Sequence, residues 1–154
     1  MDEIDRNIAV ALQEDGSSGL AELAKVAGLS VSATAERVKR LEERGVIRGW
    51  RADLDPAAVG CPMLAHVLAA VAPGRDDAAF RDRMRSEEAV LECHAVTGPW
   101  TYLLKLRVAD LAALEAFLNE DLRPLPGVER VETLVALATV KESAMLPVAP
   151  ATEE

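Results

Sequence analysis

Two short helices separated by a tight turn constrain this chain more than any other part of its sequence. Apolar residues recur at helical spacing over 20–27 and again from Val31 onward, and Gly28-Leu29-Ser30 interrupts them. The glycine can adopt the left-handed conformation that ends a helix. The leucine can fill the space between the helices, and the serine hydroxyl can cap the second helix. The spacing therefore predicts a helix-turn-helix.

Placed at about 100 degrees per residue, the second helix has one mainly apolar and one mainly polar face. A helix in the major groove of DNA presents small groups near its N-terminus to base edges, while arginine and lysine further along reach phosphates. An amphipathic hairpin whose charged side merely faces solvent is the alternative interpretation. The inward stripe is predicted to comprise Val31, Thr34, Ala35, Val38 and Leu41. The predicted DNA-binding residues are Ser30, Ser32, Ala33, Glu36, Arg37, Lys39, Arg40 and Arg44, with Ser32 and Ala33 near the bases and the four basic residues near the phosphates.

The overall charge opposes a protein that coats nucleic acid with its whole surface. The chain holds 17 Lys+Arg against 26 Asp+Glu, a net charge of -9 at pH 7. Most of the excess acid follows residue 51, whereas residues 30–51 contain six basic and three acidic side chains. Phosphate contacts release counterions, so we expect a single copy to bind weakly and with strong salt dependence. Several copies acting together would overcome this.

The pattern changes character midway, which favours two small domains. A first helix is predicted to run to about Gln13 with Asp2 as its cap, and 46–51 resembles a short strand that leaves the first domain. The proposed divisions are a helix-turn-helix domain over 1–51, a linker strand over 52–61, a second domain over 62–142 and a flexible tail over 143–154. The second domain is predicted to contain strands over 63–71, 90–97, 100–108 and 128–140, and helices over 76–86 and 110–122.

That element order, βαββαβ, predicts an antiparallel four-stranded sheet with both helices on one face, the ferredoxin-like plan of an α+β protein. Nothing else in the chain can cover the other face, and several strands are apolar on both sides. We therefore expect a homodimer formed through the sheet.

No apolar run reaches the roughly 20 residues that span a bilayer, and the start lacks the pattern of a secretory signal, so a cytoplasmic protein without membrane contact is expected.

Several short motifs follow one another in a characteristic order. They are Ile4-Asp5, Leu23-Ala24, Gly28-Leu29-Ser30, Arg37-Val38, Leu41-Glu42 and Gly45-Val46-Ile47, then 90–98, 126–130 and Thr133. Over residues 2 to about 142 this arrangement resembles the leucine-responsive regulator/AsnC (Lrp/AsnC) family of prokaryotic transcription factors. The resemblance implies a winged-helix-like DNA-binding domain and a RAM-type second domain. It also implies dimers that assemble into tetramers or octamers, binding to promoter or operator DNA, and a small effector, typically an amino acid, held between dimers.

The turn at Gly98 departs from the family, which usually reads Gly-Asp-aromatic-Asp there. This chain has Gly98-Pro99-Trp100-Thr101-Tyr102, so both acids are absent. Burying an ammonium group without a carboxylate partner is costly, and Pro99 also lacks a backbone donor. The effector is therefore less polar, differently placed or absent, and the wall offered by Trp100 and Tyr102 suits an aromatic or branched effector as well as simple interface packing. The candidate effector-binding residues are Thr97, Gly98, Pro99, Trp100, Thr101, Tyr102 and Thr133.

No catalytic or metal site is expected, and no cofactor. Cys93 and His94 are neighbours on a predicted strand and point to opposite faces, so they cannot both bind one ion with Cys61 or His66. Some relatives of the family are siroheme decarboxylases, but such an enzyme needs basic and histidine residues around a large cofactor, and the second half is acidic with two histidines. The remaining alternatives to an effector-modulated regulator are an effector-independent architectural DNA-binding protein and, less favoured, that enzyme.

Overall fold

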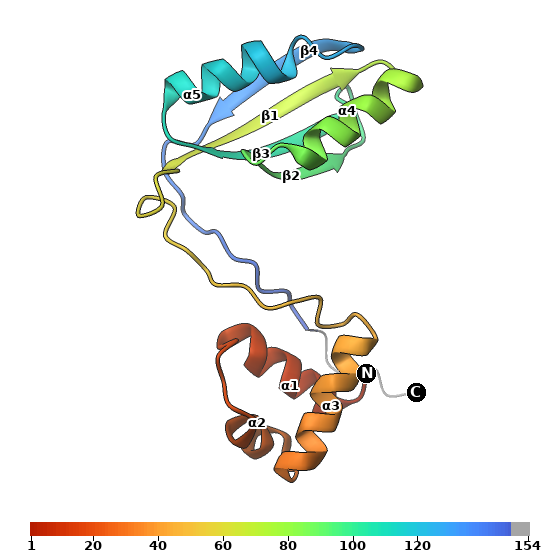
Figure 1. The fold of residues 1–154 in the computed structure, drawn as a ribbon, viewed down its shortest axis with the longest axis vertical. Coiled ribbons are helices and arrows are strands. Elements are labelled where there is room, and N and C mark those ends of the chain that lie inside the picture. The colour runs from red at the N-terminus through yellow and green to blue at the C-terminus, as the bar shows by residue number, and fades with distance from the viewer. Residues whose placement is uncertain (149–154) are drawn as a thin grey trace. The chain divides into compact units, whose positions relative to one another are not determined.

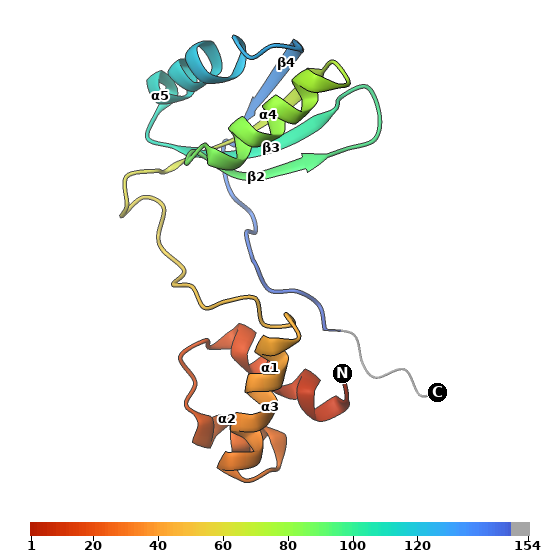
Figure 2. The same cartoon turned by 45° about the vertical axis from the view of Figure 1, so that its right-hand side comes forward.

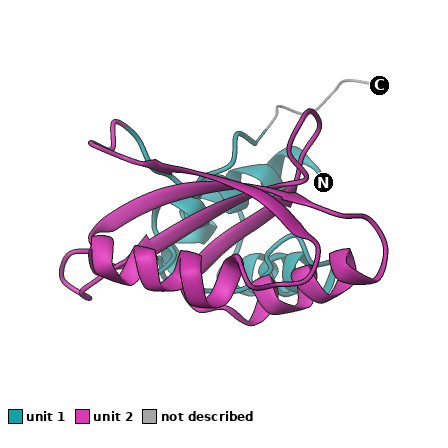
Figure 3. Ribbon diagram, turned by 90° about the horizontal axis from the view of Figure 1, so that it is seen from above, with its two compact units in different colours: residues 1–53, 141–154 teal, residues 54–140 magenta. Residues whose placement is uncertain are grey.

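The structure is a computed structural model that describes residues 1–148, and the chain forms two compact units (Figure 1, Figure 3). The first unit comprises residues 1–53 together with the chain's end from residue 141, and the second comprises residues 54–140. The first is helical and the second is built on a sheet, so the α+β class is confirmed. Each unit encloses a hydrophobic core of its own. No helix in the described part of the chain is long and apolar enough to cross a membrane.

Three helices make up the first unit: α1 (Glu3–Glu14), α2 (Leu20–Ala27) and α3 (Val31–Glu43). Asp2 caps α1 as predicted, because its Oδ1 accepts the backbone N–H of Asp5 at 2.8 Å. The turn between α2 and α3 also has the predicted chemistry. Gly28 adopts φ 65°, and the Ser30 hydroxyl accepts the N–H of Ala33 at 3.2 Å. The core of this unit consists of Ile8, Ala27 and Leu41, with Ile4, Leu12, Leu29, Val38 and Ile47 packed against it.

The predicted strands over 46–51 and 52–61 are wrong. Residues 44–62 contain turns and irregular backbone. The N–H groups of Val46 and Ile47 donate instead to the carbonyl of Leu41 and close the end of α3. Trp50 donates its indole N–H to a carboxylate oxygen of Glu42 at 3.0 Å. Residues 46–50 are therefore held by local contacts with α3, and residues 44–62 pair with no strand of this chain among the described residues.

The end of the chain returns to the first unit. Leu146 donates its N–H to the side-chain oxygen of Gln13 at 2.6 Å and accepts the Gln13 amide N–H at 3.2 Å. The predicted flexible tail began at residue 143, and its part over 149–154 lies outside the described residues. Up to residue 148 the tail is attached to α1 by this pair of hydrogen bonds.

The second unit has the predicted βαββαβ order. Its strands form one antiparallel sheet in the order β2-β3-β1-β4. Both α4 and α5 lie on the same side of that sheet (Figure 2, Figure 3). The elements are β1 (Met63–Val71), α4 (Arg75–Ser86), β2 (Val90–Ala95), β3 (Tyr102–Val108), α5 (Leu111–Ala116), the π-helical turn η1 (Phe117–Leu122) and β4 (Val128–Val135).

The buried face of the sheet packs against the helices. Alternate residues of the two central strands, β1 and β3, are buried there, as the period of a strand requires. The core comprises Val67, Ala69, Val71, Phe80, Met84, Tyr102, Leu104, Leu106, Phe117 and Leu122. The expectation that β4 continues to residue 140 is wrong. Val135 pairs with Ala65, close to the start of β1 at Met63, so the central strand offers little further backbone to a longer β4.

The other face of the sheet is covered by no helix of this unit. Its central row places His66 between Lys105 on β3 and Leu134 on β4, and the next row places Leu68 between Leu103 and Glu132. These two rows thus mix aliphatic side chains with polar and charged ones, and Leu134 is 51% exposed. A partly apolar surface of this kind is typical of an interface.

Gly127 approaches α4 more closely than any side chain would permit, which leads to a stability prediction. A Cβ added there would lie 2.5 Å from the Cβ of Asp76, and φ is +81°. Gly60 has a similar φ of +84° and open space around it. We expect Gly60→Ala to cost on the order of 1 kcal/mol through backbone strain, and Gly127→Ala to cost about 1–3 kcal/mol more through the added clash. Urea unfolding measures both, and equal losses would contradict the close approach.

Candidate nucleic-acid interface and ligand-binding region

The first turn of α3 is exposed and ordered by its own hydroxyl groups. The Oγ atoms of Ser30 and Ser32 lie 3.2 Å apart. Thr34 is fully buried, and its hydroxyl donates to the Ser30 carbonyl at 3.0 Å. Ser32 and Ala33 are exposed, as expected of residues that approach a base edge. The cap and the buried threonine together fix the backbone of this turn.

Further along α3, Lys39, Arg40 and Arg44 are exposed. Lys39 lies 3.7 Å from a carboxylate oxygen of Glu43, and Arg40 lies 3.9 Å from one of Glu36. Solvent-exposed ion pairs of this kind contribute little stability, so they can be exchanged for contacts with an anionic ligand at low cost. Three exposed cations thus follow the uncharged first turn, with exposed glutamates between them.

Arg37 is the exception among the predicted phosphate contacts. Its side chain is 23% exposed, and one guanidinium nitrogen lies 2.7 Å from a carboxylate oxygen of Asp2 and 2.7 Å from one of Asp5. The Asp5 backbone N–H, followed by this guanidinium, lowers the pKa of Asp2 below its ordinary value. Arg37 therefore joins α3 to the start of α1. The acids at the beginning of the chain were the only sequence signal for this pairing, and they are more than thirty residues away.

Val31 lies on the outside, although the helical period placed it on the inward stripe. Its side chain is 49% exposed, whereas Thr34 and Leu41 of the same stripe are buried. Val31 is the first residue of α3. A helical side chain leans toward the N-terminus of its helix, so the side chain of a first residue extends beyond the body of the helix and away from the neighbours that cover later turns. The expectation of an inward Val31 was wrong for this reason.

In the second unit, the candidate ligand loop between β2 and β3 is tied to the central strand. Thr101 accepts the N–H of Val71 at 3.0 Å through its Oγ1, and the same hydroxyl donates to the Val71 carbonyl at 3.2 Å. The Thr101 N–H donates to the carbonyl of Ala69 at 2.9 Å. The hydroxyl and the N–H group of Thr101 are therefore hydrogen-bonded within the unit. Thr97, Gly98 and Pro99 are exposed at the tip of the loop.

The two aromatic residues predicted to form one wall have separate environments. The guanidinium of Arg130 lies over the ring of Trp100, 4.2 Å from its centroid, and donates to the Pro99 carbonyl at 3.2 Å. Tyr102 is 2% exposed and stacks on Phe80 in the core, with ring centroids 4.8 Å apart. Thr133 is half-buried on β4 in register with the buried Val67, on the helix side of the sheet. Of the candidate effector residues, Trp100 and its exposed neighbours are thus accessible, whereas Tyr102 is a core residue.

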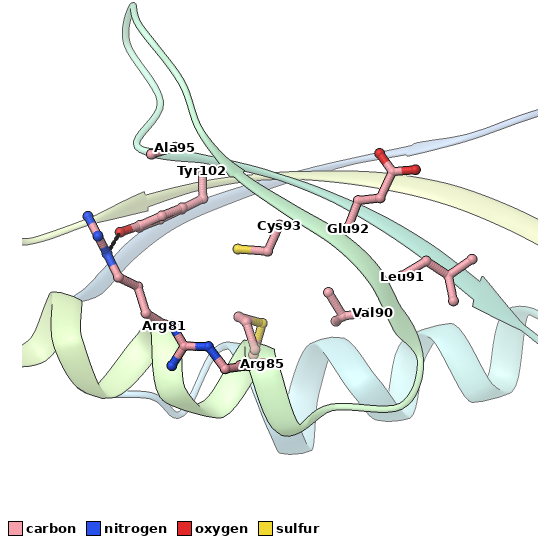
Figure 4. A pocket seen from close by; sticks show the side chains of 9 residues that line it. Arg81, Arg85, Val90, Leu91, Glu92, Cys93, Ala95 and Tyr102 are labelled. Carbon is pink, nitrogen blue, oxygen red and sulfur yellow. Dashed lines mark hydrogen bonds between the residues drawn. The ribbon is translucent and has the colours of Figure 1, made fainter. Parts of the chain in front are cut away.

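A shallow pocket lies between α4 and the edge strand β2 (Figure 4). Arg81 donates to the hydroxyl of Tyr102, which in turn donates to Asp77. The thiol of Cys93 points toward this pocket, and burial raises its pKa. His94 is directed differently, because its ring nitrogen lies 3.2 Å from a carboxylate oxygen of Glu92. Among the described residues, no group of three histidine, cysteine, aspartate or glutamate side chains is placed to hold a metal ion.

A helix-turn-helix whose second helix exposes basic side chains, followed in the chain by a ferredoxin-like sheet domain, is the domain combination of ligand-responsive transcriptional regulators. Comparison with known protein families supports both halves. Residues 1–42 match the AsnC-type helix-turn-helix domain, and residues 65–146 match the Lrp/AsnC ligand binding domain. The chain belongs to the Lrp/AsnC family of DNA-binding transcriptional regulators and is a regulator, not an enzyme.

Individual relatives agree with this assignment. The leucine-responsive regulatory protein of Escherichia coli (strain K12) is 41% identical over 145 residues, which cover 93% of this chain and 88% of the relative. A transcriptional regulator of Neisseria meningitidis in complex with L-Met has a TM-score of 0.91 at 30% identity, covering 96% of both chains. The feast or famine regulatory protein of Mycobacterium tuberculosis, complexed with L-methionine, has a TM-score of 0.85 at 38% identity, covering 94% of this chain and 97% of its own.

The pairing of Arg37 with two carboxylates predicts an acid-sensitive first unit. Because the pKa of Asp2 is lowered by folding, its contribution to the free energy of unfolding is fully present above about pH 4 and is lost as the pH falls through the folded-state pKa. We expect Arg37→Gln to lower the melting temperature at pH 7 and to flatten its decline below pH 4. Circular dichroism at a series of pH values measures this, and Lys39→Gln serves as the exposed control. An unchanged acid profile in Arg37→Gln would contradict the pairing.

Proposed function

We propose that this protein regulates transcription by inserting α3 of two subunits into successive major grooves of promoter or operator DNA, and that a small effector modulates this binding. The observation that carries the proposal is the arrangement of α3, whose exposed first turn is uncharged and is followed by the exposed cations Lys39, Arg40 and Arg44, interspersed with exposed glutamates. An uncharged surface at the start of the helix suits the base edges, and basic side chains further along suit the phosphates. Such a regulator acts where the DNA is, which is the cytoplasm of a prokaryotic cell.

The residue roles follow from exposure and pairing. Ser32 and Ala33 approach the bases, with Ser30 and Glu36 beside them. Lys39, Arg40 and Arg44 contact phosphates, since their exposed side chains can move to an anion at low cost. Arg37 contributes chiefly by holding α3 on α1, because its guanidinium is already engaged by two carboxylates.

A second copy of the chain is proposed to cover the open face of the sheet. The aliphatic side chains of that face, among them Leu68 and Leu134, would be removed from water on dimerisation. A dimer also presents two copies of α3, and half-sites roughly 34 Å apart would accommodate them. Two copies of the exposed basic residues of α3 that act together would compensate for the acidic remainder of the molecule, and further assembly into tetramers or octamers would add to this effect.

The proposed effector is an amino acid with a large apolar side chain, bound at the β2–β3 loop between dimers. Relatives crystallised with L-Met or L-methionine support this class of ligand. Residues 97–102 include no acidic side chain, so the ammonium group must find its partner elsewhere, for example on a neighbouring subunit. The absence of acidic side chains from this loop favours a second candidate, an architectural DNA-binding protein that needs no effector. The hydrogen bonds of the Thr101 hydroxyl to the backbone of Val71 favour the same candidate, because they leave it less able to bind a ligand.

Substitutions on α3 should separate affinity from sequence preference. We expect Arg40→Ala to weaken binding to all duplexes by a similar factor and to reduce the slope of log affinity against log salt by about 0.9 for each phosphate that is no longer neutralised. Ser32→Ala should change the ranking of duplexes that differ by one base pair, with little change in the slope. Fluorescence anisotropy at several salt concentrations measures both. Arg123→Ala, an exposed cation of the second unit, is the control, and an unchanged Arg40→Ala slope would contradict the assignment.

Effector binding predicts a rise in thermal stability. A ligand at 100 times its dissociation constant adds about 2.7 kcal/mol to the free energy of unfolding. In a thermal-shift screen of the amino acids, we expect L-methionine or a branched-chain amino acid to raise the melting temperature of the wild type. Trp100→Ala should abolish the rise, while Trp50→Ala in the first unit should retain it. A screen without any shift would favour the effector-independent alternative.

A further inference from the structure

The first turn of α3 offers few hydrogen bonds and several methyl groups. Residues 31–35 contain no charged side chain. The hydroxyl of Thr34 is buried against the Ser30 carbonyl, and the hydroxyl of Ser30 caps the helix and lies 3.2 Å from that of Ser32. The serine hydroxyls are therefore partly used by the protein itself. What remains freely exposed at this end of the helix is mainly apolar.

Val31 provides the largest part of that apolar surface. Its side chain is 49% exposed and belongs to no core cluster, and the exposed Ala33 adds one methyl group nearby in sequence. Exposure alone does not distinguish it, because Val46 is 43% exposed as well. The position of Val31 distinguishes it from Val46, since Val31 is the first residue of α3 and Val46 follows the other end of that helix.

The chemistry of the major groove identifies a ligand for such a surface. Base edges there carry hydrogen-bond donors and acceptors and a single kind of apolar group, the 5-methyl group of thymine. Contact between valine and thymine methyl groups removes both from water, whereas valine opposite the amino group of cytosine would leave a donor without a partner. The β-branched side chain of valine is also stiff about χ1, so the contact costs little conformational entropy.

We propose that Val31 is a specificity-determining residue that reads thymine through its 5-methyl group. This inference rests on the proposed placement of α3 in the major groove and adds to it the identity of one recognised base. It makes no use of the ligand-binding domain. The preference is expected at one position of each half-site, because a dimer presents one Val31 to each.

Deoxyuridine isolates the methyl group, because it pairs like thymidine and keeps the same hydrogen-bonding edge. The probe is a duplex that the wild-type protein selects from a random-sequence pool, prepared with thymines replaced one at a time by deoxyuridine. Burial of one methyl group is worth about 0.8 kcal/mol, which is about fourfold in affinity. We expect the wild type to lose about fourfold at one thymine of each half-site, and Val31→Ala to bind less tightly and to lose less than twofold at that position.

Val46→Ala is the matched control, and it should lose affinity at the same thymine as the wild type does. Val31→Ala is expected to fold, because alanine has the higher helix propensity and Val31 is absent from the core. Its melting temperature checks this. Absence of any sensitive thymine in the wild type, or equal sensitivity in Val31→Ala, would overturn the inference while leaving DNA binding intact. Failure to select any duplex would overturn the proposed placement of α3 itself.

Discussion

The burial of one side of α3 against α1 and α2 determines which of its residues can meet DNA. Leu41 is 1% exposed within the core that Ile8 and Ala27 share, and Thr34 is fully buried one turn from the start of the helix. Those contacts fix the rotation of the helix about its axis. Arg37 then adds a polar link to α1 through Asp2 and Asp5. Rotation by a single residue, about 100 degrees, would turn the face that carries Lys39, Arg40 and Arg44 out of its solvent-exposed position.

Local signals in the sequence were sufficient for the turn and the caps. Gly28, Ser30, Asp2 and Asp110 each act on backbone groups within four residues, so their roles can be read without knowledge of the fold. Strand periodicity was equally effective for β1, which the structure gives the predicted bounds of Met63–Val71. In the turn and the caps the partner lies close by in sequence, whereas the bounds of β1 follow from its own run of apolar residues, although its partner strands are distant.

The incorrect expectations concern contacts and helix ends that the periodicity of the sequence does not show. A strand over 46–51 would have required a partner strand, and the backbone N–H groups of Val46 and Ile47 are used by the end of α3. The pairing of Arg37 depends on carboxylates more than thirty residues away, and the core position of Tyr102 depends on its stacking against Phe80 of α4. Helical period alone placed Val31 inward, because it takes no account of where a helix begins. Tertiary contacts decided the positions of Arg37 and Tyr102, whereas the two ends of α3 decided those of Val31 and of residues 46–47.

The candidate ligand loop and the open face of the sheet share one strand, which gives a physical route for regulation. Thr101 is bonded to the backbone of Val71 and Ala69 on β1, and the same strand presents His66 and Leu68 to the uncovered face. A ligand that shifts the loop would therefore act on a strand that the proposed partner subunit also contacts. Coupling between two binding events is reciprocal, so a ligand that favours one assembly must bind more tightly to that assembly. In the proposed assembly the acidic second unit would influence DNA binding without touching DNA, because it would determine how many copies of α3 act together.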